Sequence, residues 1–446
     1  MDEFLSSLLN FDPVGWFQSL LDTAGQNPFL AMWFFIAKGG WIFFLWFFWW
    51  TGTHTWREYR RTKFWHKKEW MLMRITVPRT TEQTCRAVEN IFATFAGIHN
   101  NPSWTETWID GFVQPTITLE IASIDGIVSY YIWCERRFRN LCESAIYAQY
   151  PDADMIEVEN YAKQVPQKYP DEEWDGWGTE MMQLMPDPYP LRTYVEFEDK
   201  ISGELKDPLA NLLENFAHLG PGEQAWYQII LTPTNQKEEK ERAEKIINKI
   251  KGVEEKHKET MLDHLLKLPL MVLQELSKVV FGAGEEEHKK ENKREDFPKT
   301  MRLSPGEKNI LEALERKASK IGFRTKIRYL YLAKTHLYKK PRAVHPFVGA
   351  MKQFNTFDMQ ALKPESKVAG LSSTIWWFKN GRNWWRLTKL VRRYAKRSND
   401  GIERYFMSSE ELATLWHFPI LLQVKAPALQ RTEAKKTDAP SNIPFG

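Results

Sequence analysis

The stretch Thr116–Cys134, TITLEIASIDGIVSYYIWC, predicts a β-hairpin, and the elements around it set the fold class. Polar and apolar residues alternate over Thr116–Ser123, which is the period of a half-buried strand. Asp125-Gly126 is a two-residue turn signal, since both residue types tolerate positive φ. Ile127–Cys134 supplies the partner strand. The stretch therefore predicts two antiparallel strands joined by a tight turn.

The segments on either side of this hairpin extend it to a β-α-β-β-α-β order. Helical spacing of apolar residues, a threonine cap and a closing proline mark their limits. They are a strand at Met71–Val77, a helix from Thr80 or Thr81 to about Ala96, a helix at Phe138–Gln149 and a strand at Met155–Val158. Because this is the order of a split βαβ unit, we expect a ferredoxin-like domain over residues 70–162.

A second unit with a similar pattern follows a proline-rich, acidic connector. Its expected strands are Leu191–Glu198, Gln224–Leu231 and Arg324–Ala333, and its helices begin at Asp207-Pro208 and Ser304-Pro305. A charged insertion at 236–299 interrupts it. We therefore expect an α+β protein with two ferredoxin-like (βαββαβ-type) cytoplasmic domains, the second with a helical insertion.

Pro28–Trp50, PFLAMWFFIAKGGWIFFLWFFWW, is overwhelmingly apolar and predicts a single N-terminal transmembrane helix. About 20 apolar residues span a hydrocarbon core about 30 Å thick. Acidic residues precede the stretch and a basic collar at 51–69 follows it, so the N-terminus is expected outside and the C-terminus in the cytoplasm. The expected location is the bacterial cytoplasmic (inner) membrane. Lys38, beside Gly39 and Gly40, is either tolerated in the span or contacts a partner helix.

Changes in composition divide the chain into consecutive parts. We expect an interfacial helix on the outer face at 1–27, the span at 28–50, the collar at 51–69, a first α+β domain at 70–162, a linker at 163–190, a second α+β domain at 191–370, a basic–aromatic segment with a C-terminal helix at 371–422 and an extended tail at 423–446.

Composition and motifs argue against enzymatic chemistry. The net charge is +4, from 61 Lys and Arg against 57 Asp and Glu, so any basic surface has to be local. The three cysteines have no C-x-x-C spacing, and no G-x-x-x-x-G-K-[ST], H-E-x-x-H or G-x-S-x-G motif occurs. We expect no catalytic residue, no cofactor and no metal site.

Trp376–Arg397, WWFKNGRNWWRLTKLVRRYAKR, combines cations and aromatic residues at helical spacing. Such a pattern suits single-stranded nucleic acid, whose phosphates meet the cations and whose bases stack on the rings. It equally suits an amphipathic helix on anionic lipid, and a solvated basic face is the third interpretation. The residues expected to contact nucleic acid or anionic lipid are Arg382, Arg386, Lys389, Arg392, Arg393, Trp384 and Trp385.

Several segments together resemble one known family. They are MLMRITVPRTTEQTCRAVENIFATFAGIH, SYYIWCERRFRNLCESAIYAQYPDADMIEVENY, and SSEELATLWHFP with the tail AKKTDAPSNIP. They are similar to the membrane-anchored amino-terminal region of bacterial DNA-translocating ATPases of the type IV secretion coupling-protein kind. In that family the Pro-Ser-Asn-Ile-Pro stretch leads into an ATPase domain, whereas this sequence ends at Gly446.

The resemblance implies a non-catalytic, membrane-anchored scaffold or accessory subunit of a DNA-translocating, type IV secretion-like ATPase complex, as used in conjugation. The partners it implies are the lipid bilayer, a P-loop ATPase subunit in trans, DNA, and further copies of the chain in a homo-oligomer. Two alternatives stay open at this point: a membrane-proximal nucleic-acid-binding module without a motor, and an interaction protein of an unrelated membrane complex.

Overall fold

The computed structural model of the protein describes most of the chain after residue 40. The described residues are 41–78, 83–197, 207–251, 303–368 and 378–419, with six single positions ahead of residue 41. The chain divides into two units, Met1–Glu69 with Asn100–Val113, and Trp70–His99 with Gln114–Gly446.

The first unit contains helix α4 (Trp41–His66) and the short π-helix η3 (Glu106–Asp110). The indole Nε1 of Trp56 donates to the carbonyl oxygen of Trp108 at 3.2 Å. The rings of Phe64 and Phe112 lie 5.7 Å apart. These contacts join α4 to η3 within this unit.

No helix in the described part of the chain combines the length and the apolar character that a membrane crossing requires. The transmembrane helix predicted at Pro28–Trp50 is therefore wrong, and so is the predicted single pass through the bacterial inner membrane. Helix α4 starts at Trp41, and its apolar residues end at Trp50, before the polar run TGTHTWREYRR. Most of the predicted span ahead of Trp41 lies outside the described residues. Lys38, Gly39 and Gly40 lie outside the described residues.

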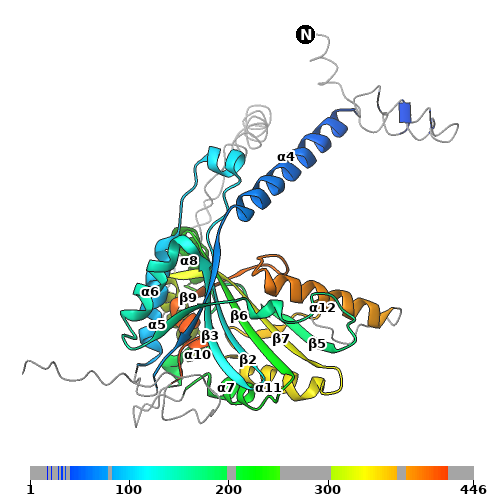
Figure 1. Ribbon diagram of the computed structural model, residues 1–446. Helices are drawn as coiled ribbons and strands as arrows, with labels where there is room; N and C mark the ends of the chain where they lie inside the picture. Colours follow the sequence, from blue (N-terminus) through cyan, green and yellow to red (C-terminus); the bar gives the residue numbers. More distant parts are fainter. Residues whose placement is uncertain are drawn as a thin grey trace, which may run out of the picture. The chain divides into compact units, whose positions relative to one another are not determined.

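The second unit is built on one antiparallel sheet of nine described strands (Figure 1). The strand order is β4-β1-β3-β2-β6-β7-β5-β8, and β9 pairs with β7. The strands are β1 (Trp70–Thr76), β2 (Ile117–Ile124), β3 (Ile127–Glu135), β4 (Asp154–Val158), β5 (Trp174–Gln183), β6 (Glu223–Pro233), β7 (Gly322–Lys334), β8 (Leu362–Pro364) and β9 (Tyr405–Ser408).

This continuous sheet contradicts the prediction of two ferredoxin-like domains after a transmembrane helix. Ile117–Ile124 of β2 pairs with Gln224–Leu231 of β6, which joins the two halves of the sheet. Each half has the same strand order, β4-β1-β3-β2 and β8-β5-β7-β6. An unpaired strand edge exposes backbone donors and acceptors, and pairing β2 with β6 removes two such edges. The strands therefore share one sheet and one main core.

The second half of the sheet also begins earlier in the sequence than predicted. Strand β5 lies within 163–190, which was expected to be a linker, and the expected strand at Leu191–Glu198 contains the 3₁₀ turn η6 (Tyr194–Glu196). Of the insertion, α8 (Gln236–Lys251) is described. The other described helices are α5 (Cys85–Phe95), α6 (Arg139–Tyr147), α7 (Ala210–Ala217), α10 (Pro305–Ser319), α11 (Lys340–Lys352), α12 (Lys379–Ala395) and α13 (Ser409–Leu415).

The hairpin that was predicted from the Asp-Gly turn is confirmed. β2 and β3 pair from Ile124↔Ile127 to Thr118↔Trp133. Asp125 and Gly126 have φ values of 54° and 83°, as a type I′ turn requires. A Cβ on Gly126 would lie 2.4 Å from the carbonyl oxygen of Leu219, so the turn also needs glycine for space.

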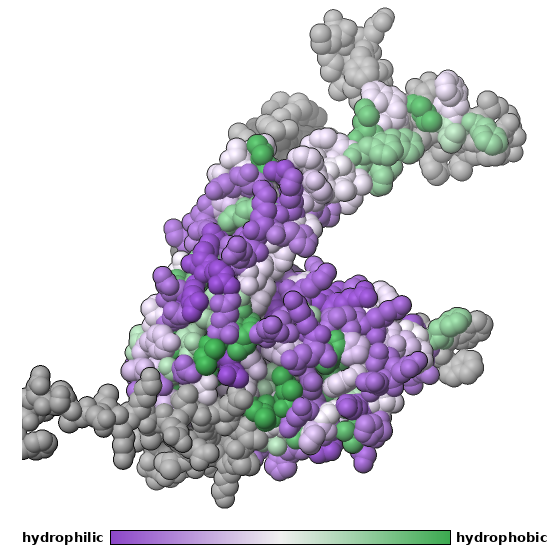
Figure 2. Space-filling model, in the orientation of Figure 1, coloured by the Kyte–Doolittle hydropathy of each residue, from purple (hydrophilic) through white to green (hydrophobic). Residues whose placement is uncertain are grey.

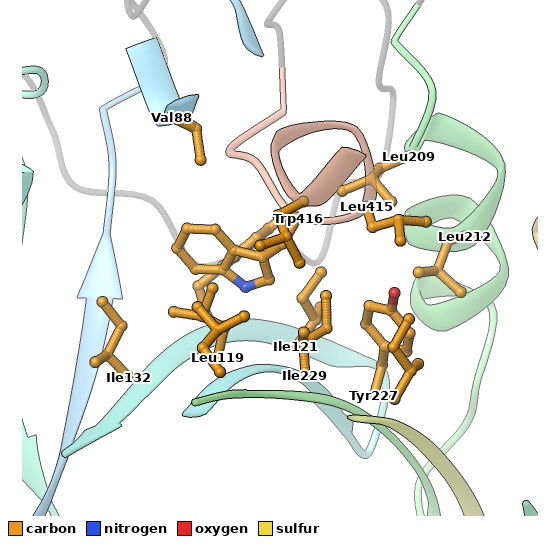
Figure 3. Close-up of a cluster of buried hydrophobic side chains, with 14 of the residues drawn as sticks. Val88, Leu119, Ile121, Ile132, Leu209, Leu212, Tyr227, Ile229, Leu415 and Trp416 are labelled. Carbon is orange, nitrogen blue, oxygen red and sulfur yellow. The ribbon is translucent and has the colours of Figure 1, made fainter. Parts of the chain in front are cut away.

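The main core lies between one face of the sheet and helices α5, α7 and α13 (Figure 3). Leu119 and Ile121 of β2 point from the sheet toward Val88 of α5 and toward Trp416. The Trp416 side chain is fully buried, and its ring lies 6.5 Å from that of Phe92 and 5.8 Å from that of Tyr130. Because side chains alternate along a strand, Glu120 between Leu119 and Ile121 points to the opposite face.

Candidate functional site

Helix α12 packs on this opposite face of the sheet. Its buried residues, Leu387, Leu390, Val391 and Tyr394, recur at helical spacing and form one apolar stripe. A Cβ on Gly178 of β5 would lie 2.6 Å from Leu390 Cδ2, so this glycine allows the helix to approach the strand closely. The cationic residues of α12 therefore lie away from this stripe, and Figure 2 shows hydrophilic residues over the surface where Figure 1 places α12.

A row of buried polar side chains crosses four neighbouring strands beneath the end of α12. Glu120, Gln228, Arg328 and Glu180 are register partners on β2, β6, β7 and β5, and each is 0% exposed. Gln228 Nε2 donates to Glu120 at 2.7 Å, and Arg328 Nη1 donates to the Gln228 oxygen at 3.3 Å. Arg328 Nε donates to Glu180 at 2.8 Å. The row is thus hydrogen-bonded from end to end.

Arg397, just after α12, closes this row at Glu120. Its Nε and Nη2 donate to the two carboxylate oxygens at 2.9 and 3.0 Å. Tyr161 donates to the same carboxylate at 2.8 Å, and its hydroxyl lies 2.8 Å from that of Tyr394. Burial, the largest single influence, lowers the pKa of Arg397, but the charge and hydrogen bonds of Glu120, together with Tyr161 and Tyr394, outweigh it and leave the pKa raised. The pair is therefore shielded from water.

The sheet also binds the loop that follows α12. Lys326 Nζ donates to the Asn399 carbonyl at 2.6 Å, and Arg328 Nη2 donates to the Asp400 carbonyl at 2.6 Å. Glu180 accepts from the Ile402 backbone N–H at 2.9 Å. Gly401 has a φ of 123°, and a Cβ there would overlap the Glu180 carboxylate. These bonds fix residues 399–402 against the sheet.

A groove of about 680 Å³ lies between α12 and this fixed loop. It is located where the neighbour of β7 changes, because β5 pairs with β7 from Ile327 onward and β9 pairs with Gly322–Thr325. Five cationic and three acidic side chains line it, so it is locally basic although the whole chain is nearly neutral. The lining comprises Met182, Gln183, Met185, Asp187, Glu365, Lys367, Val368, Trp385, Arg386, Lys389, Arg393 and residues 401–405.

The carboxylates in the groove are partly engaged, whereas most of its cations are not. Asp187 pairs with Arg324 at 2.6 Å, and Glu365 accepts from the backbone N–H of Lys367 at 2.9 Å. By contrast, the side chains of four lining cations form no ion pair with any described carboxylate. These four, which we call the groove cations, are Lys367, Arg386, Lys389 and Arg393.

The structure divides the residues that were predicted to contact nucleic acid or lipid. Trp385, Arg386, Lys389 and Arg393 line the groove, and the Lys389 ammonium lies 4.8 Å from the Trp385 ring centroid. Trp384 lines a separate cavity of about 220 Å³. Arg392 Nε donates to the Gln167 carbonyl at 2.9 Å, and neither Arg392 nor Arg382 lines the groove.

Sequence reasoning missed Lys367 and the buried row beneath α12. Glu120 and Arg328 occupy the polar positions of alternating strands, a pattern that usually marks a solvated face. Charged residues within strands rich in apolar residues were the available signal, in TITLEIAS and in KIRYLYLA. Within the described residues, no cluster of His, Cys, Asp or Glu is arranged to hold a metal ion.

Residues 56–427 match the family described as "Domain of unknown function (DUF8128)". The comparison with curated proteins found no match. Because the matched family is uncharacterised, the expected assignment to type IV secretion and conjugation is corrected to a domain of unknown function. The resemblance to coupling proteins and the ATPase partner remain predictions.

Proposed function

The chain belongs to the DUF8128 family of unknown function, and we propose that it is a binding module that holds single-stranded nucleic acid in the groove beside α12. The observation that carries the proposal is the set of groove cations, which lie beside Trp385 without carboxylate partners in the described residues. Cations of this kind gain most from an anionic ligand, because no internal ion pair has to be broken when the ligand binds.

The spacing of the groove cations suits a chain of phosphates. Arg386, Lys389 and Arg393 recur at i, i+3 and i+7, so they lie on one side of α12 along about 10 Å of its axis. Neutralising phosphates releases their condensed counterions, which supplies most of the affinity at low salt. The groove therefore favours a polymeric anion over a single small one.

Trp385 favours a single strand over a duplex. Its side chain is 63% exposed although it lines the groove, so a ring face is open to a ligand. Bases can stack on an aromatic ring when they are unpaired, whereas a duplex hides their faces inside its own stack. Stacking on such a ring contributes about 1–3 kcal/mol per base.

Replacing three groove cations tests this proposal. The variant Arg386→Gln/Lys389→Gln/Arg393→Gln is expected to lose most of its affinity for an oligonucleotide of about 12 bases, because three phosphate contacts are lost. Trp385→Ala is expected to weaken binding about 5- to 150-fold, the equivalent of one stacked base. Fluorescence anisotropy with a labelled oligonucleotide measures both effects.

Arg392→Gln is the matched control for the charge on α12. Arg392 is exposed and donates to the Gln167 carbonyl outside the groove, so its replacement is expected to leave the affinity nearly unchanged. If Arg392→Gln and the single variant Arg386→Gln lost equal affinity for the oligonucleotide, binding would depend only on the net positive charge of α12. That result would contradict a groove-specific site. Binding to anionic lipid vesicles without binding to oligonucleotides would contradict the proposal as well.

A further inference from the structure

Lys326 lies in β7 at the point where the neighbouring strand changes from β5 to β9. Its neighbour Ile327 pairs with Met181 of β5, and its neighbour Thr325 pairs with Tyr405 of β9. The side chain is 0% exposed, and Nζ donates to the Asn399 carbonyl at 2.6 Å. Residues 401–405, just after Asn399, form one wall of the groove. The ammonium is therefore held against the segment that leads into this wall.

The charged groups that face Lys326 are mostly cations. Around it, β5 contributes Glu180, β7 contributes Arg328, α12 contributes Arg393, and the segment after α12 contributes Arg404. Arg324 lies on the same face of β7, two residues away. Arg328 already binds Glu180 at 2.8 Å, and Arg324 is paired with both Asp187 and Glu239 at 2.6 Å. No carboxylate of the described residues forms an ion pair with Lys326 itself. A buried cation without a counter-ion is costly, so this position favours an incoming anion.

We propose that an anionic strand in the groove supplies the counter-charge that Lys326 lacks, and that binding takes up a proton at this residue. The inference rests on the proposed function and concerns the regulation of the same groove. A phosphate near Arg393 reduces the repulsion that Lys326 experiences and stabilises its charged form. Lys326 acts through the local field rather than by touching the strand, so it is a positioning residue.

The direction of the effect follows from the protonation state of the free protein. Burial is the main cause that lowers the pKa of Lys326 to about 8, with repulsion by Arg328, Arg393 and Arg404 acting in the same direction against Glu180. At about pH 8, where the pH equals this pKa, about half of the molecules carry a neutral Lys326. A bound anion raises this pKa, so a proton is taken up, and by linkage the affinity falls as the pH rises through about 8.

Isothermal titration calorimetry in buffers of different ionisation enthalpy measures the proton uptake directly. With a single-stranded oligonucleotide of about 12 bases near pH 8, the wild type is expected to take up about half a proton per site. Between about pH 7 and about pH 9 its affinity is expected to fall by up to about tenfold. Lys326→Arg, which stays charged, is expected to bind with no uptake and no such fall.

Lys326→Met provides a second variant in which the charge is absent at every pH. It is expected to bind more weakly than the wild type at about pH 7, again without proton uptake. Circular dichroism during heating checks that both variants fold. Wild-type binding without proton uptake, or uptake that persists in Lys326→Arg, overturns this inference and leaves the proposed function standing. No oligonucleotide binding at about pH 7 overturns both.

Discussion

Glu120→Ala is expected to lower the free energy of unfolding by about 3–5 kcal/mol, because it leaves a buried charge without its partner. Arg397 is 1% exposed and places two donors on the Glu120 carboxylate. Gln228 and Tyr161 lose the same acceptor. Water does not reach these groups, so nothing replaces the lost bonds. Denaturation in urea, followed by far-ultraviolet circular dichroism, gives the change.

Two further variants separate the burial of the charge from the loss of an ion pair as such. Glu143→Ala removes a surface ion pair with Arg139, in which the Arg139 side chain is 42% exposed and the Glu143 side chain 25%. The free energy of unfolding is expected to fall by about 0–1 kcal/mol. Combining Glu120→Leu with Arg397→Met removes both charges and is expected to recover much of the stability. A Glu120→Ala variant as stable as Glu143→Ala would show that the buried row contributes little.

Trp416→Ala is expected to lower the free energy of unfolding by about 3–5 kcal/mol, the range for deleting a large aromatic side chain from a core. Trp416 follows α13 and lies between α5 and the sheet in Figure 3, in contact with Phe92 and Tyr130. The neighbours that surround its ring come from distant parts of the chain, so they cannot all move in to fill the space. The same urea titration measures the loss.

Trp385→Ala is the control for this second prediction. It also removes an indole, but from a side chain that is 63% exposed. The free energy of unfolding is expected to change by no more than about 0.5 kcal/mol, since exposed positions outside the core, caps and ion-pair networks tolerate substitution. If Trp416→Ala and Trp385→Ala were equally stable, Trp416 would not hold the C-terminal segment in the core.

The local elements of the first half were predictable, because each depends on residues that are close in sequence. The Asp125-Gly126 turn and the alternation around it determine the β2–β3 hairpin without reference to the rest of the chain. The pairing of β2 with β6 was not predictable in this way, since neither strand carries a local signal for its outer neighbour. Strand β5 was missed because Gly176 and Gly178 resemble linker residues.

The same distinction applies to the candidate site. The basic and aromatic pattern of α12 included four residues that line the groove, Trp385, Arg386, Lys389 and Arg393, because that pattern lies on one helix. Which cations of α12 line the groove, and that Arg392 does not, depends on how α12 packs. The groove itself depends on the change from β5 to β9 as the neighbour of β7 beside Lys326. Glu120 and Arg397 pair across much of the chain, a contact that composition and spacing do not reveal.

The salt dependence of oligonucleotide binding tests the central claim most directly. For a single strand, the logarithm of the association constant falls with the logarithm of salt concentration by about 0.7 for each neutralised phosphate. Between about 50 and about 200 mM salt, replacing Arg386, Lys389 and Arg393 by Gln is therefore expected to reduce the steepness of this dependence by roughly 2, while Arg392→Gln leaves it unchanged. A wild-type protein that binds no single strand at the lowest salt, or a slope that the three substitutions do not alter, would contradict the assignment of the groove to nucleic acid.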